Sequence, residues 1–144
     1  MGGECGASLV EMALLLPLFA VILFAAIDFG RACYLAIEIQ GAARAGAVYG
    51  SRSPTDTTGI QAVAEDDAPD VPNLTVGTPA YGCECSDGTN YSASCATTPS
   101  CSGKTEVYRV DVKVTGTYTP LLPWPGIPST MNFSSTASMR SAGS

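Results

Sequence analysis

The sequence contains no histidine. The commonest general base and the commonest metal-binding side chain are therefore both missing. Charged residues are also scarce, at 14% of the 144 residues, and acidic residues outnumber basic ones by 13 to 7. A chain with a net charge of −6 and no basic run lacks the charge pattern that binds phosphate backbones, so no nucleic-acid partner is expected. Because the sequence also lacks a glycine-rich phosphate loop and a catalytic cluster, we expect no enzymatic activity, no cofactor and no metal.

The apolar residues crowd into the first fifty positions of the chain. An uncharged run extends from Met12 to Ile27, and Leu9 and Val10 lengthen it to nineteen residues interrupted by Glu11. About twenty apolar residues in a helix span the core of a bilayer, so this run predicts a membrane span. A cleaved secretory signal is the alternative, but such a signal starts with basic residues and has a shorter apolar run. No Lys or Arg precedes the run here.

Helical character continues beyond the apolar run. A helix over residues 7–52 would be roughly 65–70 Å long, so its second half would project from the membrane. Pro17 and Gly30 are candidate positions for bends. Small residues at spacings of three, four or seven let helices approach closely, which predicts packing against other subunits. The alternative is an ordinary helix packed on its own domain. The candidate packing residues are Gly30, Ala36, Ala43 and Ala47.

Glu11 is a carboxylate near one end of the apolar run. Such a group costs about 2.5–3.5 kcal/mol deep in a bilayer, so it is expected to have a partner there, although at the headgroup boundary the cost is small. The segment from Gly6 through Ala7 to Glu11 is similar to the processing site of type IV pilin-like proteins. In those proteins a peptidase cuts after a glycine and leaves glutamate as the fifth residue of the mature chain. The resemblance implies cleavage between Gly6 and Ala7.

The wider N-terminal region, from Gly6 to Ser51, resembles the TadE-type pseudopilins of tight-adherence (Flp) pilus systems. The matching elements are Gly6, Val10-Glu11-Met12-Ala13-Leu14, Leu16-Pro17, Asp28-Phe29-Gly30-Arg31 and Ala42-Ala43-Arg44-Ala45-Gly46. The combination of these elements over about forty-five residues is far more specific than any one of them. One departure is Met12, which stands where an aromatic residue commonly follows the glutamate.

The resemblance implies a minor pilin. Residues 1–6 would be a leader peptide, residues 7–52 the spanning and projecting helix, and residues 53–144 an extracytoplasmic domain. The protein would lie in the inner membrane as a single-pass precursor with its C-terminal domain outside the cytoplasm. Its partners would be that membrane, a prepilin peptidase, and other pilin-like subunits and pilus assembly proteins. The alternative is an uncleaved, membrane-anchored domain that binds another envelope protein or a ligand.

The C-terminal part predicts a short helix and a small sheet, hence an α+β fold. Residues 53–59 are rich in Ser, Thr, Pro and Gly and end the long helix. A short helix follows, capped by Thr57 or Thr58 and stopped by Pro69. Residues 74–78 predict a first strand. Apolar and polar residues alternate over 107–118 and again from 131 to 139, which predicts two further strands. Prolines stiffen the loop between them, over 120–128.

Four cysteines lie in one polar stretch of the C-terminal part: Cys83, Cys85, Cys95 and Cys101. Clustered cysteines in such a stretch predict disulfides in an oxidising compartment. Cys83 and Cys85 are too close in sequence for a relaxed bond to each other. Two pairings remain, Cys83–Cys95 with Cys85–Cys101, or Cys83–Cys101 with Cys85–Cys95. A zinc site is the alternative, although the spacing differs from the usual pairs and histidine is absent.

Overall fold

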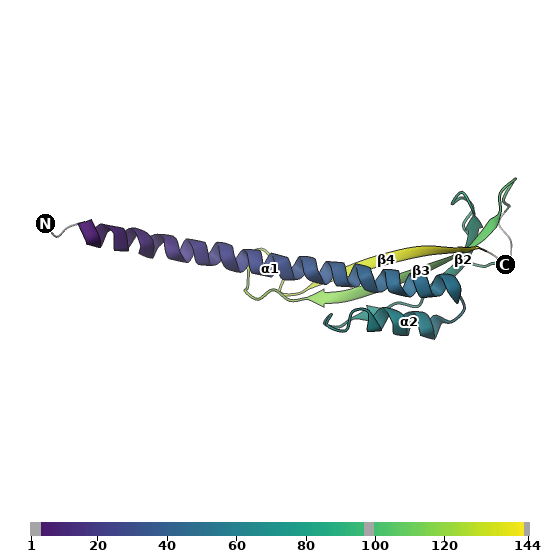
Figure 1. The fold of residues 1–144 in the computed structure, drawn as a ribbon, viewed down its shortest axis with the longest axis horizontal. Helices are drawn as coiled ribbons and strands as arrows, with labels where there is room; N and C mark the ends of the chain where they lie inside the picture. The colour runs from purple at the N-terminus through teal and green to yellow at the C-terminus, as the bar shows by residue number, and fades with distance from the viewer. Residues whose placement is uncertain (1–3, 97–99, 143–144) are drawn as a thin grey trace.

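The fold is α+β, as the sequence predicts. We describe it from a computed structural model, which covers residues 4–96 and 100–142. A very long helix comes first, then a short helix, then an antiparallel sheet (Figure 1). The elements are α1 (Glu4–Arg52), α2 (Thr57–Asp66), β1 (Thr75–Val76), β2 (Ala80–Cys85), β3 (Glu106–Tyr118) and β4 (Met131–Ala142).

Helix α1 is one uninterrupted helix of 49 residues. At 1.5 Å per residue it is about 73 Å long. It continues through Pro17 and Gly30, and Figure 1 shows a gentle curve at most, without the sharp bends that these residues predict. Its C-terminal half lies along the sheet and beside α2, whereas its N-terminal half extends away from the rest of the chain (Figure 1). The domain and the projecting segment are therefore joined by a single continuous helix.

Strand β3 is the centre of the sheet. Strand β4 pairs with it over its whole length, from Tyr118 opposite Met131 to Val107 opposite Ala142. Strands β2 and β1 share its other side, one after the other. The alternation predicted over 107–118 is confirmed: Val110, Val112, Val114 and Tyr118 are buried together with Gly116, and the alternate residues are less buried.

The core lies between this face of the sheet and α1. Gly46 and Gly50 allow the close approach, because a Cβ on Gly50 would lie 2.8 Å from Val110 Cγ1 and one on Gly46 would lie 3.2 Å from Val112 Cγ1. The sequence predicts that Ala43 and Ala47 contact other subunits. In the structure both residues are fully buried in this core. These two small residues of α1 therefore serve the packing of the helix on its own domain, which is the alternative named above.

Helix α2 begins one or two residues earlier than the predicted caps, Thr57 or Thr58, imply. Its N-cap is Asp56, whose Oδ1 accepts the backbone N–H of Gly59 over 3.0 Å. The expected caps, Thr57 and Thr58, lie inside the helix. An aspartate caps a helix at least as well as threonine, and here the hydroxyl of Tyr49 on α1 also donates to Asp56 over 2.7 Å. The cap thus ties α2 to α1 and lowers the pKa of the Asp56 carboxyl.

Strand β2 is an element that the alternation of apolar and polar residues does not predict. Its last four residues, Gly82 to Cys85, are all buried, so it has no outward polar face. The first predicted strand, over residues 74–78, is shorter in the structure and comprises Thr75–Val76. The proline-rich loop, which we define as residues 119–130, forms no helix or strand, as predicted.

Candidate functional site

Most of the exposed large apolar side chains among the described residues lie on the projecting segment, which we define as residues 8–27 of α1. Large apolar side chains line all sides of it, with Leu9 71% and Leu14 72% exposed. Within the described residues, one helix is long and apolar enough to cross a membrane, and none of its most apolar window is buried. A segment of this kind is stable only in a bilayer or against other apolar helices.

Glu11 lies on this segment. Its side chain is exposed, and no described residue of the chain pairs with it. A carboxylate on an apolar helix that has no partner within its own chain is free to pair with another molecule. The backbone of Gly6 and Ala7 belongs to α1, but the surroundings of this expected processing site lie outside the described residues, as do residues 1–3 of the expected leader.

The four candidate packing residues all lie C-terminal to the projecting segment, but they differ in exposure. Ala43 and Ala47 are buried in the domain, and Ala36 is half-buried beside it. Gly30 is exposed, and a Cβ placed on it would meet nothing within 4 Å. Of the four, Gly30 is the residue that leaves an open surface for another subunit.

Asp28 marks the point at which α1 enters the domain. It is only 5% exposed, although it follows directly after the projecting segment. The phenol of Tyr118 donates to its Oδ1 and also contacts its backbone carbonyl at 2.8 Å. The backbone N–H of Leu121 donates to Oδ1 over 3.1 Å, and the indole Nε1 of Trp124 donates to Oδ2 over 2.7 Å. We call Asp28, Tyr118, Leu121 and Trp124 the junction.

The junction keeps a buried carboxylate stable by surrounding it with donors. Arg31 adds a positive charge, with its Nη1 3.7 Å from Oδ1 of Asp28. Burial of the Tyr118 phenol, together with its hydrogen bond to Asp28, raises the pKa of Tyr118 to about 12. The phenol is therefore a donor at neutral pH. Sequence motifs place Asp28 in a family pattern but give no sign of its partners, which lie 90 or more positions away.

The cysteines at the far end of the domain form two disulfides. Cys83 bonds to Cys95 and Cys85 bonds to Cys101, which is the first of the two pairings left open by the sequence. All four sulfurs are therefore occupied, and the zinc alternative is wrong. Each bond closes a loop of 12 to 16 residues, a size that stabilises a fold by about 3 kcal/mol in the chain-entropy model.

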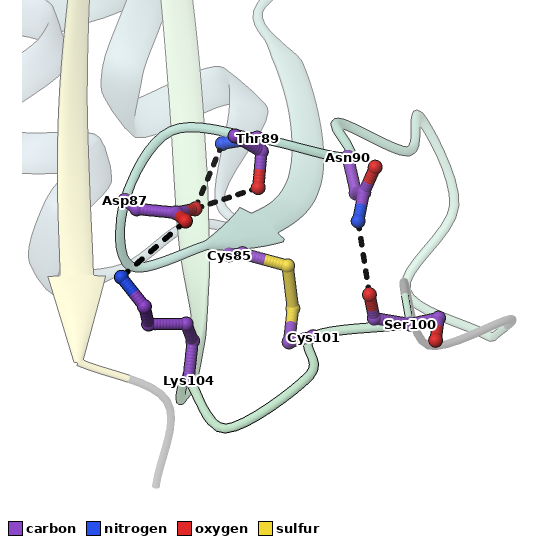
Figure 2. The surroundings of a disulfide bond; sticks show 7 residues. All are labelled: Cys85, Asp87, Thr89, Asn90, Ser100, Cys101 and Lys104. Carbon is purple, nitrogen blue, oxygen red and sulfur yellow. Dashed lines mark hydrogen bonds and ion pairs between the residues drawn. A yellow bond between two sulfur atoms is a disulfide. The ribbon is translucent and has the colours of Figure 1, made fainter.

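Local polar contacts hold the chain on either side of the Cys85–Cys101 disulfide, as Figure 2 shows for Asp87, Thr89 and Lys104. Asp87 accepts the backbone N–H and the hydroxyl of Thr89, over 3.1 and 2.6 Å, and its other oxygen lies 3.5 Å from Lys104 Nζ. These contacts lower the pKa of the Asp87 carboxyl, with the Thr89 hydroxyl as the largest cause. They give a segment with few apolar residues a defined shape.

Glu84 lies between the two disulfide-bonded cysteines of β2 and is 1% exposed. Its carboxylate pairs with Arg109 of β3, over 3.2 Å, and with Arg140 of β4. Arg109 also binds Asp111 over 2.8 Å. One buried acid thus connects three neighbouring strands, and its two arginines are exposed enough to remain in contact with water. Among the described residues, no group of three or more His, Cys, Asp or Glu is placed to hold a metal ion.

Comparison with known proteins gives one match. The family model described as TadE-like protein matches residues 6–48, which comprise the projecting segment, Asp28 and most of the helix that packs on the sheet. No curated protein and no solved structure matches the chain. The resemblance that the motifs indicate is therefore confirmed, and residues 6–48 form a TadE-like segment.

Proposed function

We propose that the chain is a minor pilin of a tight-adherence pilus system. Residues 9–27 hold it in the inner membrane, a prepilin peptidase removes residues 1–6, and the projecting segment then packs against other pilin-like subunits. The C-terminal domain stays outside the cytoplasm. In this proposal the protein works through assembly and has no catalytic role.

The observation that carries the proposal is the unpartnered state of the projecting segment. It exposes large apolar side chains on all sides, none of its most apolar window is buried, and it lies in the part of the chain that matches the TadE-like family. The disulfides support the placement of the domain, because such bonds persist in the envelope and are rare in the cytosol.

Glu11 has a specific role in the proposal. Cleavage after Gly6 creates an α-amino group on Ala7, and this cation on one subunit would pair with Glu11 of a neighbour. In an apolar bundle the attraction between opposite charges is stronger than in water, and each charge needs a partner to offset its desolvation. Glu11 meets the requirement of being unpaired, since none of the residues that the structure describes pairs with it.

Intact-mass analysis of the membrane-extracted protein, with and without reduction and thiol alkylation, tests the processing. A mass that begins at Ala7, with four cysteines protected until reduction, is expected. A mass that retains residues 1–6 would instead favour the uncleaved anchored domain, and four freely alkylated cysteines would contradict the oxidised envelope location.

A substitution at Glu11 tests the assembly. Glu11→Leu is expected to insert in the membrane and to fold normally, but to be missing from pilin complexes recovered by crosslinking and co-purification. Glu11→Asp, which keeps the carboxylate, is the matched control and is expected to retain most of the assembly. Normal piliation by Glu11→Leu would remove the role assigned to this residue.

A further inference from the structure

The proline-rich loop exposes apolar side chains without any charged neighbour in sequence. Leu121 is 55%, Leu122 41% and Ile127 48% exposed. No charged residue occurs from Thr119 to Met139. A soluble surface seldom gathers large exposed apolar side chains in one loop that has no charge, so this loop requires an explanation.

The loop is fixed against α1 at one level. Leu121 and Trp124 both donate to Asp28, so the middle of the loop cannot move along the helix without breaking the junction. An apolar cavity of about 320 Å³ lies between the loop and the helix, lined on the helix side by Ala25 and Phe29. Figure 1 shows the loop as the part of the domain that reaches furthest toward the N-terminal end of α1.

The level of the loop coincides with the end of the membrane span. The apolar run ends at Ile27, one residue before Asp28. Nineteen residues of helix are about 28 Å long, which matches the core of a bilayer. When this run fills the bilayer, Asp28 lies at the boundary between the hydrocarbon and the headgroups. The loop bound to Asp28 must then lie at the same boundary.

We propose that the proline-rich loop is a second membrane contact, in which Leu121, Leu122 and Ile127 enter the interfacial layer of the bilayer and Trp124 lies at the headgroup level. Tryptophan is enriched at this depth because its ring is apolar and its N–H is polar. Here the N–H already has a partner in Asp28. On the helix, Phe29 and Arg31 lie next to Asp28 at the same boundary, and Phe29 is 71% exposed. This inference rests on the proposed anchoring by residues 9–27.

Lipid is the occupant that the observations favour, because the exposed loop is continuous with a segment that is itself exposed and apolar. The prolines also support this contact. A loop stiffened by Pro120, Pro123, Pro125 and Pro128 loses little conformational entropy when it enters the interface. A second copy of the chain is the competing occupant and is treated as an outcome of the test.

Trp124 is the single tryptophan of the chain, so tryptophan emission excited selectively over the tyrosines reports on this loop alone. The full chain is reconstituted in phosphatidylcholine and phosphatidylglycerol vesicles that carry bromine on the acyl chains, either near the headgroup or near the bilayer centre. Quenching of Trp124 by the shallow bromine, and weaker quenching by the deep bromine, is expected. The double substitution Leu121→Ser and Leu122→Ser should reduce this quenching and shift the emission to the red, because the loop loses two of its apolar side chains. The substitution keeps the backbone N–H of residue 121 that binds Asp28, so the junction itself is not removed.

Two reporters in a Trp124→Phe background separate the loop from the anchor. Phe19→Trp lies in the projecting segment and is expected to be quenched by the deep bromine. Tyr91→Trp lies beside β2, at the opposite end of the domain, and is expected to be unquenched. If Phe19→Trp is quenched while Trp124 is not, the loop proposal is wrong and the anchoring stands. If neither is quenched, the anchoring fails, and the loop proposal fails with it. Emission of Trp124 that depends on protein concentration but not on bromine would assign the loop to a second copy instead.

Discussion

Trp124 donates its indole N–H to the carboxylate of Asp28 over 2.7 Å, across 96 positions of sequence. The contact joins the loop between the two longest strands to the residue at which α1 leaves the domain. Tyr118 and the backbone of Leu121 bind the same carboxylate. Three groups from one end of the sheet therefore define where the domain stops and the projecting segment starts.

Removal of the Asp28 carboxylate is expected to destabilise the domain. Asp28→Ala leaves the Tyr118 hydroxyl and the Trp124 indole without their acceptor, and buried donors without acceptors are costly. We expect the unfolding midpoint of the full chain in detergent to fall by roughly 10 °C. Asp28→Asn, which keeps one acceptor oxygen, should cause a smaller decrease. Circular dichroism and Trp124 emission would both follow the transition.

Asp66→Ala is the matched control for this prediction. Asp66 is an exposed acid in the last turn of α2, and its loss should change the midpoint very little. Equal midpoints for Asp28→Ala and Asp66→Ala would show that the junction does not stabilise the domain.

The stability of the domain is expected to fall at high pH. The pKa of Tyr118 is raised from 10.0 to about 12 by burial and by Asp28, so the folded state favours the protonated phenol. This stabilisation is complete below pH 10 and is lost as the pH rises through the folded pKa, near 12. Urea unfolding of the full chain at several pH values in this window would measure the decrease.

Tyr118→Phe provides the comparison for the pH series. The variant lacks the titrating group, so its stability should change less between pH 10 and 12 than that of the unsubstituted chain. Tyr81, whose pKa is also raised by burial, is present in both proteins and cancels in the difference. Parallel curves for the two proteins would refute the assignment to Tyr118.

Removal of the two arginines that pair with the buried Glu84 should lower the free energy of unfolding more than removal of the Glu84 charge itself. If Arg109→Gln and Arg140→Gln are combined, a buried carboxylate loses both cations, and we expect a loss of about 3–5 kcal/mol in the free energy of unfolding. Glu84→Gln should cost less, because the released arginines are exposed enough to be hydrated. Urea unfolding of the oxidised protein measures both values, and a larger loss for Glu84→Gln would reverse this explanation.

Substitutions at Asp56 and at the adjacent Thr57 should affect the stability of α2 differently, because only Asp56 is the N-cap. Asp56→Ala removes the acceptor of Gly59 and of the Tyr49 hydroxyl, and it should lower the unfolding midpoint by roughly 5 °C. Thr57→Ala, which changes the next residue along the chain, should lower it far less, because Thr57 is already inside the helix. Thermal scans by circular dichroism would distinguish the two, and the opposite order would restore the cap expected from sequence.

Local patterns in the sequence predicted most of the elements. The alternation over β3 and β4 is visible because one face of each strand is polar, and α1 is visible because its apolar run is long. Strand β2 has no such signal, since Glu84 is a charged residue that is buried by partners on two other strands. The sequence of β2 alone cannot show that a glutamate there will be enclosed by arginines.

The interpretation of small residues in α1 shows a second limit. Ala43 and Ala47 have the spacing expected for contact between subunits, yet they are buried in the core of their own domain. Spacing predicts that a helix has a close neighbour, but it does not say which neighbour. The junction had no local signal at all, because Asp28, Tyr118 and Trp124 come together only when the sheet has formed.

The continuity of α1 has a mechanical consequence. Since no break separates the projecting segment from the part buried in the domain, a single helix transmits a displacement of one half to the other. A push along the membrane normal would raise the domain by the same distance as the helix, and a rotation of the helix would turn the sheet through the same angle. Lifting the subunit out of the bilayer would also draw the proline-rich loop away from the headgroups. Extraction would therefore have to break the lipid contacts of the projecting segment and of the loop at the same time.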